Sequence, residues 1–148
     1  MITDSYLYIA VRRKTRFIFE SEGVQGKIVK IIQFSPMDDN EWNLGFGDLK
    51  SGFVDDSIVS NNQDTVKVLQ TVARATYEFF NTYPDSVVII NPVDERRRKL
   101  YNRIFQRHIK DISTVCDVTG VIGTEKELYE SQKYYESFKI KLKFESWN

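Results

Sequence analysis

In the first half of the chain, short apolar segments alternate with turns of glycine, proline or clustered polar residues, a pattern that predicts an antiparallel meander of strands. Gly26 marks one such turn, because glycine adopts positive φ without steric cost, and the cations Arg12, Arg13 and Lys14 form another. The third segment is apolar at odd and even positions alike, which is typical of a central strand. We expect strands over residues 6–11, 16–21, 27–34 and 42–48.

In the second half, apolar residues recur every three or four positions in two stretches, which predicts two amphipathic helices. The first helix follows Asn62 or Asp64, either of which can cap it by accepting a hydrogen bond from a free N–H group, and it ends at Pro84. The second helix follows Asp94 and runs to about residue 109. Strands are expected over 87–90, 115–122 and 138–144, with a short third helix opened by Thr124 between the last two.

These elements predict an α+β fold, with a mainly antiparallel curved sheet, two principal helices packed on one face and a short third helix. A chain of 148 residues has the size of one domain, and no linker divides it, so we expect a single domain over residues 1–148. No internal repeat or low-complexity segment interrupts the pattern.

Charge and cysteine content narrow the function classes. The 21 cationic and 21 acidic side chains give zero formal net charge, which argues against disorder and against a uniformly basic surface but not against a local basic patch. The single Cys116 excludes an intrachain disulfide and favours a reducing compartment. The N-terminus lacks the charge order of a secretory signal, and no apolar run approaches the roughly 18–20 residues of a membrane span. We therefore expect a cytoplasmic protein without a membrane partner.

The second predicted helix carries most of the candidate chemistry. A line of cations at spacings of three and four residues falls on one side of the helix, and it consists of Arg96, Lys99, Arg103, Arg107 and Lys110, flanked by Arg97 and Arg98. Clustered arginines repel one another, so an anion is expected nearby, and the planar guanidinium suits phosphate. The anion can be phosphate, nucleic acid or the chain's own carboxylates. If the carboxylates of the chain neutralise the cations, the line is an ordinary solvated helix face.

A second candidate is the polar segment before the first helix, which contains Asp55, Asp56, Asn61, Asn62 and Asp64. Carboxylate and amide oxygens suit Mg²⁺, whereas a helix N-terminus favours anions, and capping explains most of these residues. We predict no metal site and no cofactor. His108 is expected to be partly buried and Cys116 to behave as a small hydrophobe, while the two glycines of Leu44–Asp48 precede no helix and make a weak phosphate loop.

The sequence also resembles the DUF6934 type of family, small proteins found mainly in Bacteroidetes. The resemblance rests on Gly26-Lys27-Ile28, Lys30, the segment 43–48, Asp55-Asp56, Ser60-Asn61-Asn62, Asp64, Lys67-Val68-Leu69, Tyr83-Pro84, Arg97, Leu100-Tyr101, Tyr135 and Phe138. It spans almost the whole chain but brings no activity with it. It implies that the acidic and asparagine-rich segment and the Arg–Tyr helix belong together. Small hydroxyl residues of the family pattern before Arg97 are missing here, which puts any phosphate-binding role of theirs in doubt.

Three functions are compatible with these residues, and whether the chain is an enzyme stays open. The favoured one is a small protein-interaction module, of the toxin–antitoxin or phage-defence kind, whose charged helix pairs with an acidic partner. The first alternative is a nucleic-acid or phosphate-binding protein that uses Arg96, Arg97, Lys99, Arg103 and Arg107, with Tyr101 as a stacking residue. The second is a ribonuclease, dependent on a metal or not, with Asp56, Asp64, Arg97, Tyr101 and Arg103 as catalytic candidates.

Overall fold

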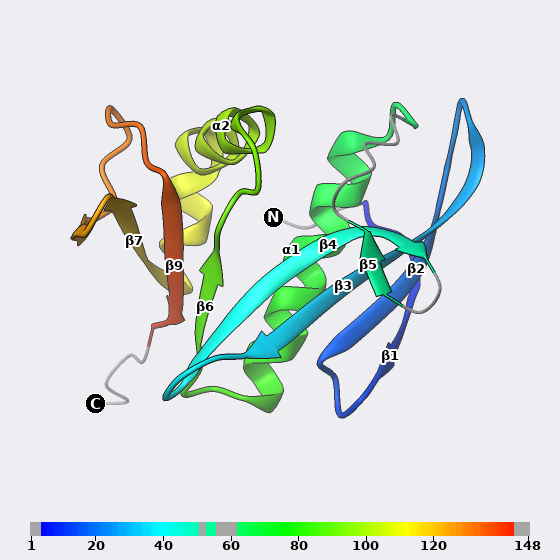
Figure 1. Ribbon diagram of the computed structural model, residues 1–148, viewed down its shortest axis with the longest axis horizontal. Helices are drawn as coiled ribbons and strands as arrows, with labels where there is room; N and C mark the ends of the chain where they lie inside the picture. Colours follow the sequence, from blue (N-terminus) through cyan, green and yellow to red (C-terminus); the bar gives the residue numbers. More distant parts are fainter. Residues whose placement is uncertain (1–3, 51–52, 56–61, 144–148) are drawn as a thin grey trace. The chain divides into compact units, whose positions relative to one another are not determined.

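The computed structural model describes residues 4–50, 53–55 and 62–143 (Figure 1). Along the chain the elements are β1 (Tyr8–Val11), β2 (Arg16–Gly23), β3 (Gly26–Pro36), β4 (Glu41–Lys50), β5 (Phe53–Asp55), α1 (Thr65–Thr82), β6 (Val87–Ile90), α2 (Glu95–Ile112), β7 (Cys116–Ile122), β8 (Glu125–Leu128) and β9 (Ser137–Leu142). The strands pair in the order β1-β2-β3-β4-β6-β9-β7-β8, and β5 pairs with β4.

The fold class predicted from the sequence is confirmed: the protein is α+β, and its mixed sheet is mostly antiparallel. The pairings β1–β2, β2–β3, β4–β5, β6–β9, β7–β9 and β7–β8 are antiparallel, whereas β4 and β6 run parallel. Within the described residues, no helix is long and apolar enough to span a membrane. Sheet curvature and the packing of both helices on one face stay predictions.

The chain divides into two compact units. Unit 1 comprises Met1–Ser35 and Leu44–Pro84, and unit 2 comprises Pro36–Asn43 and Asp85–Asn148. Strand β4 contributes residues to both, because its first residues pair with β6 and its last residues with β5. Each unit contains one of the two helices, α1 in unit 1 and α2 in unit 2.

The core of unit 1 is aromatic and lies between α1 and one face of β2 and β3. Phe34 of β3 stacks on Phe79 of α1 with ring centroids 4.1 Å apart, and Phe17 meets Phe34 edge-on at 6.0 Å. Phe17 is paired with Ile32 across β2 and β3, so these two residues share the face that α1 covers. Burial of each such side chain stabilises the fold by about 1.5–3 kcal/mol, which is why α1 forms where its apolar spacing predicts it.

The core of unit 2 lies between α2 and the face of β7 and β9 that carries Phe138. Phe105 of α2 stacks on Phe138 at 4.3 Å, and Tyr135 is fully buried beside them. Gly120 of β7 is required for this packing, because a β-carbon there would lie 2.3 Å from the Tyr135 ring. The buried Asn102 of α2 completes the contact.

One predicted element is wrong. Residues 125–128 form strand β8, which pairs with Thr119–Ile122 of β7, instead of a short third helix. Gly123 has a φ of +60° and shares a two-residue turn with Thr124, the arrangement of a tight β-hairpin. The spacing of Thr124 and Glu127 imitates a helix capping box, but pairing with β7 decides the structure.

Candidate functional site

Helix α2 begins where its sequence predicts. The Asp94 carboxylate accepts a hydrogen bond from the backbone N–H of Arg97 at 2.8 Å and so caps the first turn. The helix ends at Ile112, and Ser113 donates its backbone N–H to the Ile109 carbonyl. One side of the helix is buried and the other is exposed, which fixes the direction of every charged side chain it carries.

The buried side of α2 is anchored by Asn102. Its side-chain amide donates to the carbonyl oxygens of Tyr135 and Arg98 at 2.8 and 2.9 Å, and its side-chain oxygen accepts the backbone N–H of Tyr135 at 2.8 Å. The two hydrogen bonds with Tyr135 thus fix the rotation of α2 against the segment before β9, while the bond to Arg98 lies within α2. The anchor was not anticipated, because its partner lies 33 residues away and no local spacing signals it.

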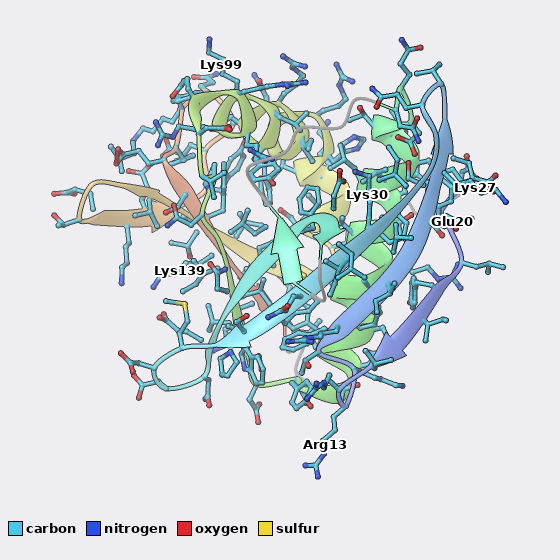
Figure 2. The ribbon with its side chains drawn as sticks, turned by 45° about the vertical axis from the view of Figure 1, so that its right-hand side comes forward. Arg13, Glu20, Lys27, Lys30, Lys99 and Lys139 are labelled. Carbon is cyan, nitrogen blue, oxygen red and sulfur yellow. The ribbon has the colours of Figure 1, made fainter. Side chains whose placement is uncertain are left out.

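The exposed side of α2 carries the predicted line of cations. Arg96, Lys99, Arg103, Arg107 and Lys110 are all exposed, and we call these five the basic row. Lys99 lies on the outer side of the helix in Figure 2. From Arg96 to Lys110 the row follows about 21 Å of helix. Among the residues that the structure describes, no carboxylate lies within ion-pair distance of any of the five.

The two neighbouring arginines differ from the basic row. Arg97 forms an ion pair with Asp94 at 2.7 Å, and Arg98 forms one with Glu95 at 2.9 Å. Glu95 also accepts the hydroxyl of Tyr134 at 2.7 Å, and this hydrogen bond, followed by the charges of Arg98 and Lys99, lowers the pKa of Glu95. Local neutralisation, one of the sequence-based alternatives, therefore holds for Arg97 and Arg98.

The remaining candidates on and beside α2 are distributed differently. Tyr101 is 9% exposed and lies on the buried side of the helix, so its ring is not presented to a base for stacking. His108 is exposed, contrary to prediction, because it lies at the margin of the buried stripe formed by Tyr101, Asn102 and Phe105. Cys116 is buried as expected, and burial raises the pKa of its thiol to about 11.

The polar segment before α1 contributes to a buried hydrogen-bond network in unit 1. The side-chain amide of Asn62, which is 2% exposed, donates to Ser21 Oγ at 3.0 Å and to the Gly26 carbonyl at 2.9 Å. Its side-chain oxygen accepts the backbone N–H of Gln25 at 2.6 Å. Asn62 therefore ties the β2–β3 turn to the start of α1. Gly23 is required here, because a β-carbon would lie 1.9 Å from the backbone oxygen of Asn62.

Asp64 belongs to the same network. It is the N-cap residue of α1 by position, yet its side chain makes no capping hydrogen bond. Instead its carboxylate accepts the hydroxyl groups of Tyr6, at 2.6 Å, and of Ser21. Burial and then the hydrogen bond to Asp64 raise the pKa of Tyr6. One oxygen of the carboxylate thus holds the segment before β1 and strand β2 to the start of α1.

Unit 1 also contains a buried ion pair, on the face of β3 that α1 covers. Lys30 Nζ of β3 lies 2.7 Å from the Asp48 carboxylate of β4, and the two residues are 9% and 5% exposed. Lys30 is paired with Phe19 in register, so it points to the face that α1 covers. The segment Leu44–Asp48 is part of strand β4, as the predicted strand over residues 42–48 requires. The weak phosphate-loop candidate is therefore strand, and its Asp48 makes this ion pair.

Two predicted site residues, Asp56 and Asn61, lie outside the described residues, as does the side chain of Asp55. In the parts of the chain that the structure does describe, no three His, Cys, Asp or Glu side chains come close enough together to hold a metal ion. The residues that carry the sequence resemblance converge within each unit: Lys30 with Asp48 and Gly26 with Asn62 in unit 1, and Tyr135 with Phe138 in unit 2.

Comparison with known proteins identifies a family. The model of a family of unknown function, DUF6934, matches residues 3–143. No curated protein and no solved structure matches the chain.

Proposed function

The chain belongs to the DUF6934 family, whose function is unknown, and from this premise we propose that the protein binds nucleic acid through the basic row of α2. One observation carries the proposal. Five exposed cations follow one side of a helix without a carboxylate partner among the described residues, although Arg97 and Arg98 on the same helix each have one. A fold that neutralises two of seven cations and exposes the other five presents a surface for an external anion.

The shape of the row favours a linear polyanion over a single phosphate. Like charges three or four residues apart on a helix destabilise it by about 0.2–0.5 kcal/mol per pair. The row contains four such neighbouring pairs along about 21 Å of helix. A small anion contacts one or two of these cations, whereas a phosphate backbone offsets the repulsion along the whole row and releases its own counterions.

The composition of the row favours nucleic acid over an acidic protein. The centres of protein–protein interfaces are rich in aromatic side chains and poor in charged ones, and lysine is depleted there. The large apolar side chains that are exposed within the described residues lie outside α2. Protein–nucleic acid interfaces are positively charged and polar, and their affinity comes mainly from phosphate contacts. The basic row matches that second description.

The other functions expected from the sequence stay predictions. A protein-interaction module, a toxin–antitoxin or phage-defence role, and a ribonuclease each lack a contact in the described residues that favours them over nucleic-acid binding. For the ribonuclease, the Asp64 carboxylate is engaged by Tyr6 and Ser21, and Tyr101 is buried.

A pair of arginine substitutions on one helix tests the proposal. Fluorescence anisotropy measures the Kd of short single-stranded RNA, single-stranded DNA and duplex DNA for the wild type, for Arg103→Ala/Arg107→Ala and for Arg97→Ala/Arg98→Ala. Both variants lose two positive charges from α2, but only the first removes cations without ion-pair partners. We expect the first variant to weaken binding by about tenfold or more at low salt and the second much less. Equal losses, or no binding by the wild type, would count against the basic row.

A further inference from the structure

The turn between β1 and β2 has an unusual backbone. Arg12, Arg13 and Lys14 are three consecutive residues with positive φ, at 53°, 56° and 63°. All three are exposed, and the pairing of Val11 with Arg16 closes the hairpin behind them. Figure 2 shows Arg13 projecting from the tip of this hairpin, away from the strands.

Positive φ is costly at these positions. An L-residue with a β-carbon crowds its own carbonyl oxygen there, whereas glycine and, to a lesser degree, asparagine and aspartate adopt the conformation readily. The turn is held by hydrogen bonds from Thr15 Oγ1 to the Arg12 carbonyl at 2.7 Å and from the Tyr83 hydroxyl to the Arg13 carbonyl at 2.8 Å. Long cationic side chains thus occupy positions where small residues fit best, and the two hydrogen bonds hold the backbone of the turn in this conformation.

The charges at the tip are mostly uncompensated. Lys14 lies 3.8 Å from Glu78 of α1. Within the described parts of the chain, neither Arg12 nor Arg13 has a carboxylate at ion-pair distance. The β2–β3 hairpin shows the opposite arrangement, since Lys27 lies 3.7 Å from Glu20 and 3.8 Å from Glu22. Figure 2 shows Lys27 beside Glu20.

We propose that the Arg12–Lys14 turn is a second phosphate-binding site, which contacts the backbone of a bound nucleic acid through the guanidinium groups of Arg12 and Arg13. The inference rests on the proposed function for the identity of the ligand. Strained backbone persists only where the surrounding structure holds it, and it is found most often at functional sites. A guanidinium binds a phosphate through two parallel hydrogen bonds, and a two-stranded β-ribbon is narrow enough to enter the major groove of duplex DNA.

Strain and binding make opposite predictions for one variant, which gives a sharp test. Arg12→Gly/Arg13→Gly removes both guanidinium groups and relieves the backbone. We expect its melting temperature to be unchanged or higher by about 2–4 °C, while duplex DNA binds about tenfold or more weakly and the slope of log K against log salt decreases by about 2. Lys27→Ala, an exposed cation that already has carboxylate partners, serves as the control and should leave binding nearly unchanged.

Unchanged duplex binding by a folded Arg12→Gly/Arg13→Gly variant would overturn the second site. If glycine lowers the melting temperature, Arg12→Asn/Arg13→Asn decides in its place, because asparagine tolerates positive φ and keeps a side chain. Failure of this inference is distinguishable from failure of the proposed function. If the basic-row variant loses binding and the turn variants do not, only the turn is excluded; if the wild type does not bind, both proposals fall.

Discussion

Two polar regions of the molecule differ in where their partners lie: the buried polar network of unit 1, formed by Ser21, Asn62 and Asp64, and the basic row of unit 2. In the network, Asn62, Asp64 and Ser21 find their partners within the protein. In the basic row, cations such as Arg103 and Arg107 are exposed and have no carboxylate partner among the described residues. Polar residues in the sequence therefore do not by themselves identify a binding site. The useful criterion is whether the fold already supplies partners for those residues.

This difference separates stability from function. A buried polar atom that loses its partner costs the fold its full desolvation free energy, whereas an exposed cation contributes little to stability. Substitutions in the network and in the buried Lys30–Asp48 ion pair should mainly lower the free energy of unfolding, and substitutions in the basic row should mainly change binding.

The largest effect is expected at the buried ion pair. Lys30→Ala removes the cation that lies 2.7 Å from the buried Asp48 carboxylate, so we expect the free energy of unfolding to fall by about 3–5 kcal/mol. Urea denaturation measures this change. The double variant Lys30→Met/Asp48→Leu removes both charges and should be clearly more stable than Lys30→Ala. A Lys30→Ala variant as stable as the wild type would show that the pair is better solvated than its burial indicates.

A smaller loss is expected in the hydrogen-bond network. Asn62→Ala removes three hydrogen bonds and leaves the buried Ser21 Oγ short of a donor, which should cost about 1–3 kcal/mol. The exposed Asn81 of α1 offers a matched control, because Asn81→Ala should change stability by less than about 0.5 kcal/mol. Equal effects at the two asparagines would mean that the network does not hold the β2–β3 turn to α1.

Alkaline pH should lower the free energy of unfolding through Cys116 and Tyr8. Burial raises the pKa of Cys116 from 9.0 to about 11 and that of Tyr8 from 10.0 to about 12. Because the folded state holds these protons more tightly, the contribution of the two groups to the free energy of unfolding is fully present below pH 9. It is lost progressively as the pH rises from there toward 12. Urea midpoints measured across this range should fall, and less steeply for Cys116→Ala. Rapid reaction of the native thiol with a disulfide reagent at pH 8 would contradict its burial.

The smallest stability effect is expected in the basic row itself. Arg103→Ala/Arg107→Ala removes two exposed cations and relieves like-charge repulsion, so the free energy of unfolding should stay within about 0.5 kcal/mol of the wild type. Thermal denaturation followed by circular dichroism is sufficient to check this. A loss of several kcal/mol would place these arginines among the structural residues and would remove the distinction between the two regions.

Local sequence signals were enough for the elements that depend on local chemistry. Asp94 caps α2 as its position predicts, and Pro84 follows the end of α1 closely. The basic row follows from spacing alone, since residues three and four apart share a helix side. The ion pairs of Arg97 and Arg98 could also have been anticipated, because each partner lies three residues away.

Features that depend on partners far away in the chain could not be predicted from the sequence. The sequence predicts that Asn62 or Asp64 caps α1, but the Asp64 carboxylate accepts hydroxyl groups from Tyr6 and Ser21, which lie 58 and 43 residues away. The ion pair of Lys30 and Asp48 has no local signal in the sequence, because it depends on how β3 and β4 lie in the fold. Residues 125–128 satisfy a helical capping pattern locally, and only the pairing with β7 makes them a strand. The positive φ of Arg12, Arg13 and Lys14 has no signature in residue type.

The most direct measurement of whether the basic row binds nucleic acid is the salt dependence of duplex DNA binding by the wild type and the two arginine-pair variants. Each phosphate contact contributes about 0.9 to the slope of log K against log salt. We expect Arg103→Ala/Arg107→Ala to reduce that slope by nearly 2 and Arg97→Ala/Arg98→Ala to leave it almost unchanged. A slope that is the same for the wild type and both variants would show that nucleic acid, if bound at all, does not contact this side of α2.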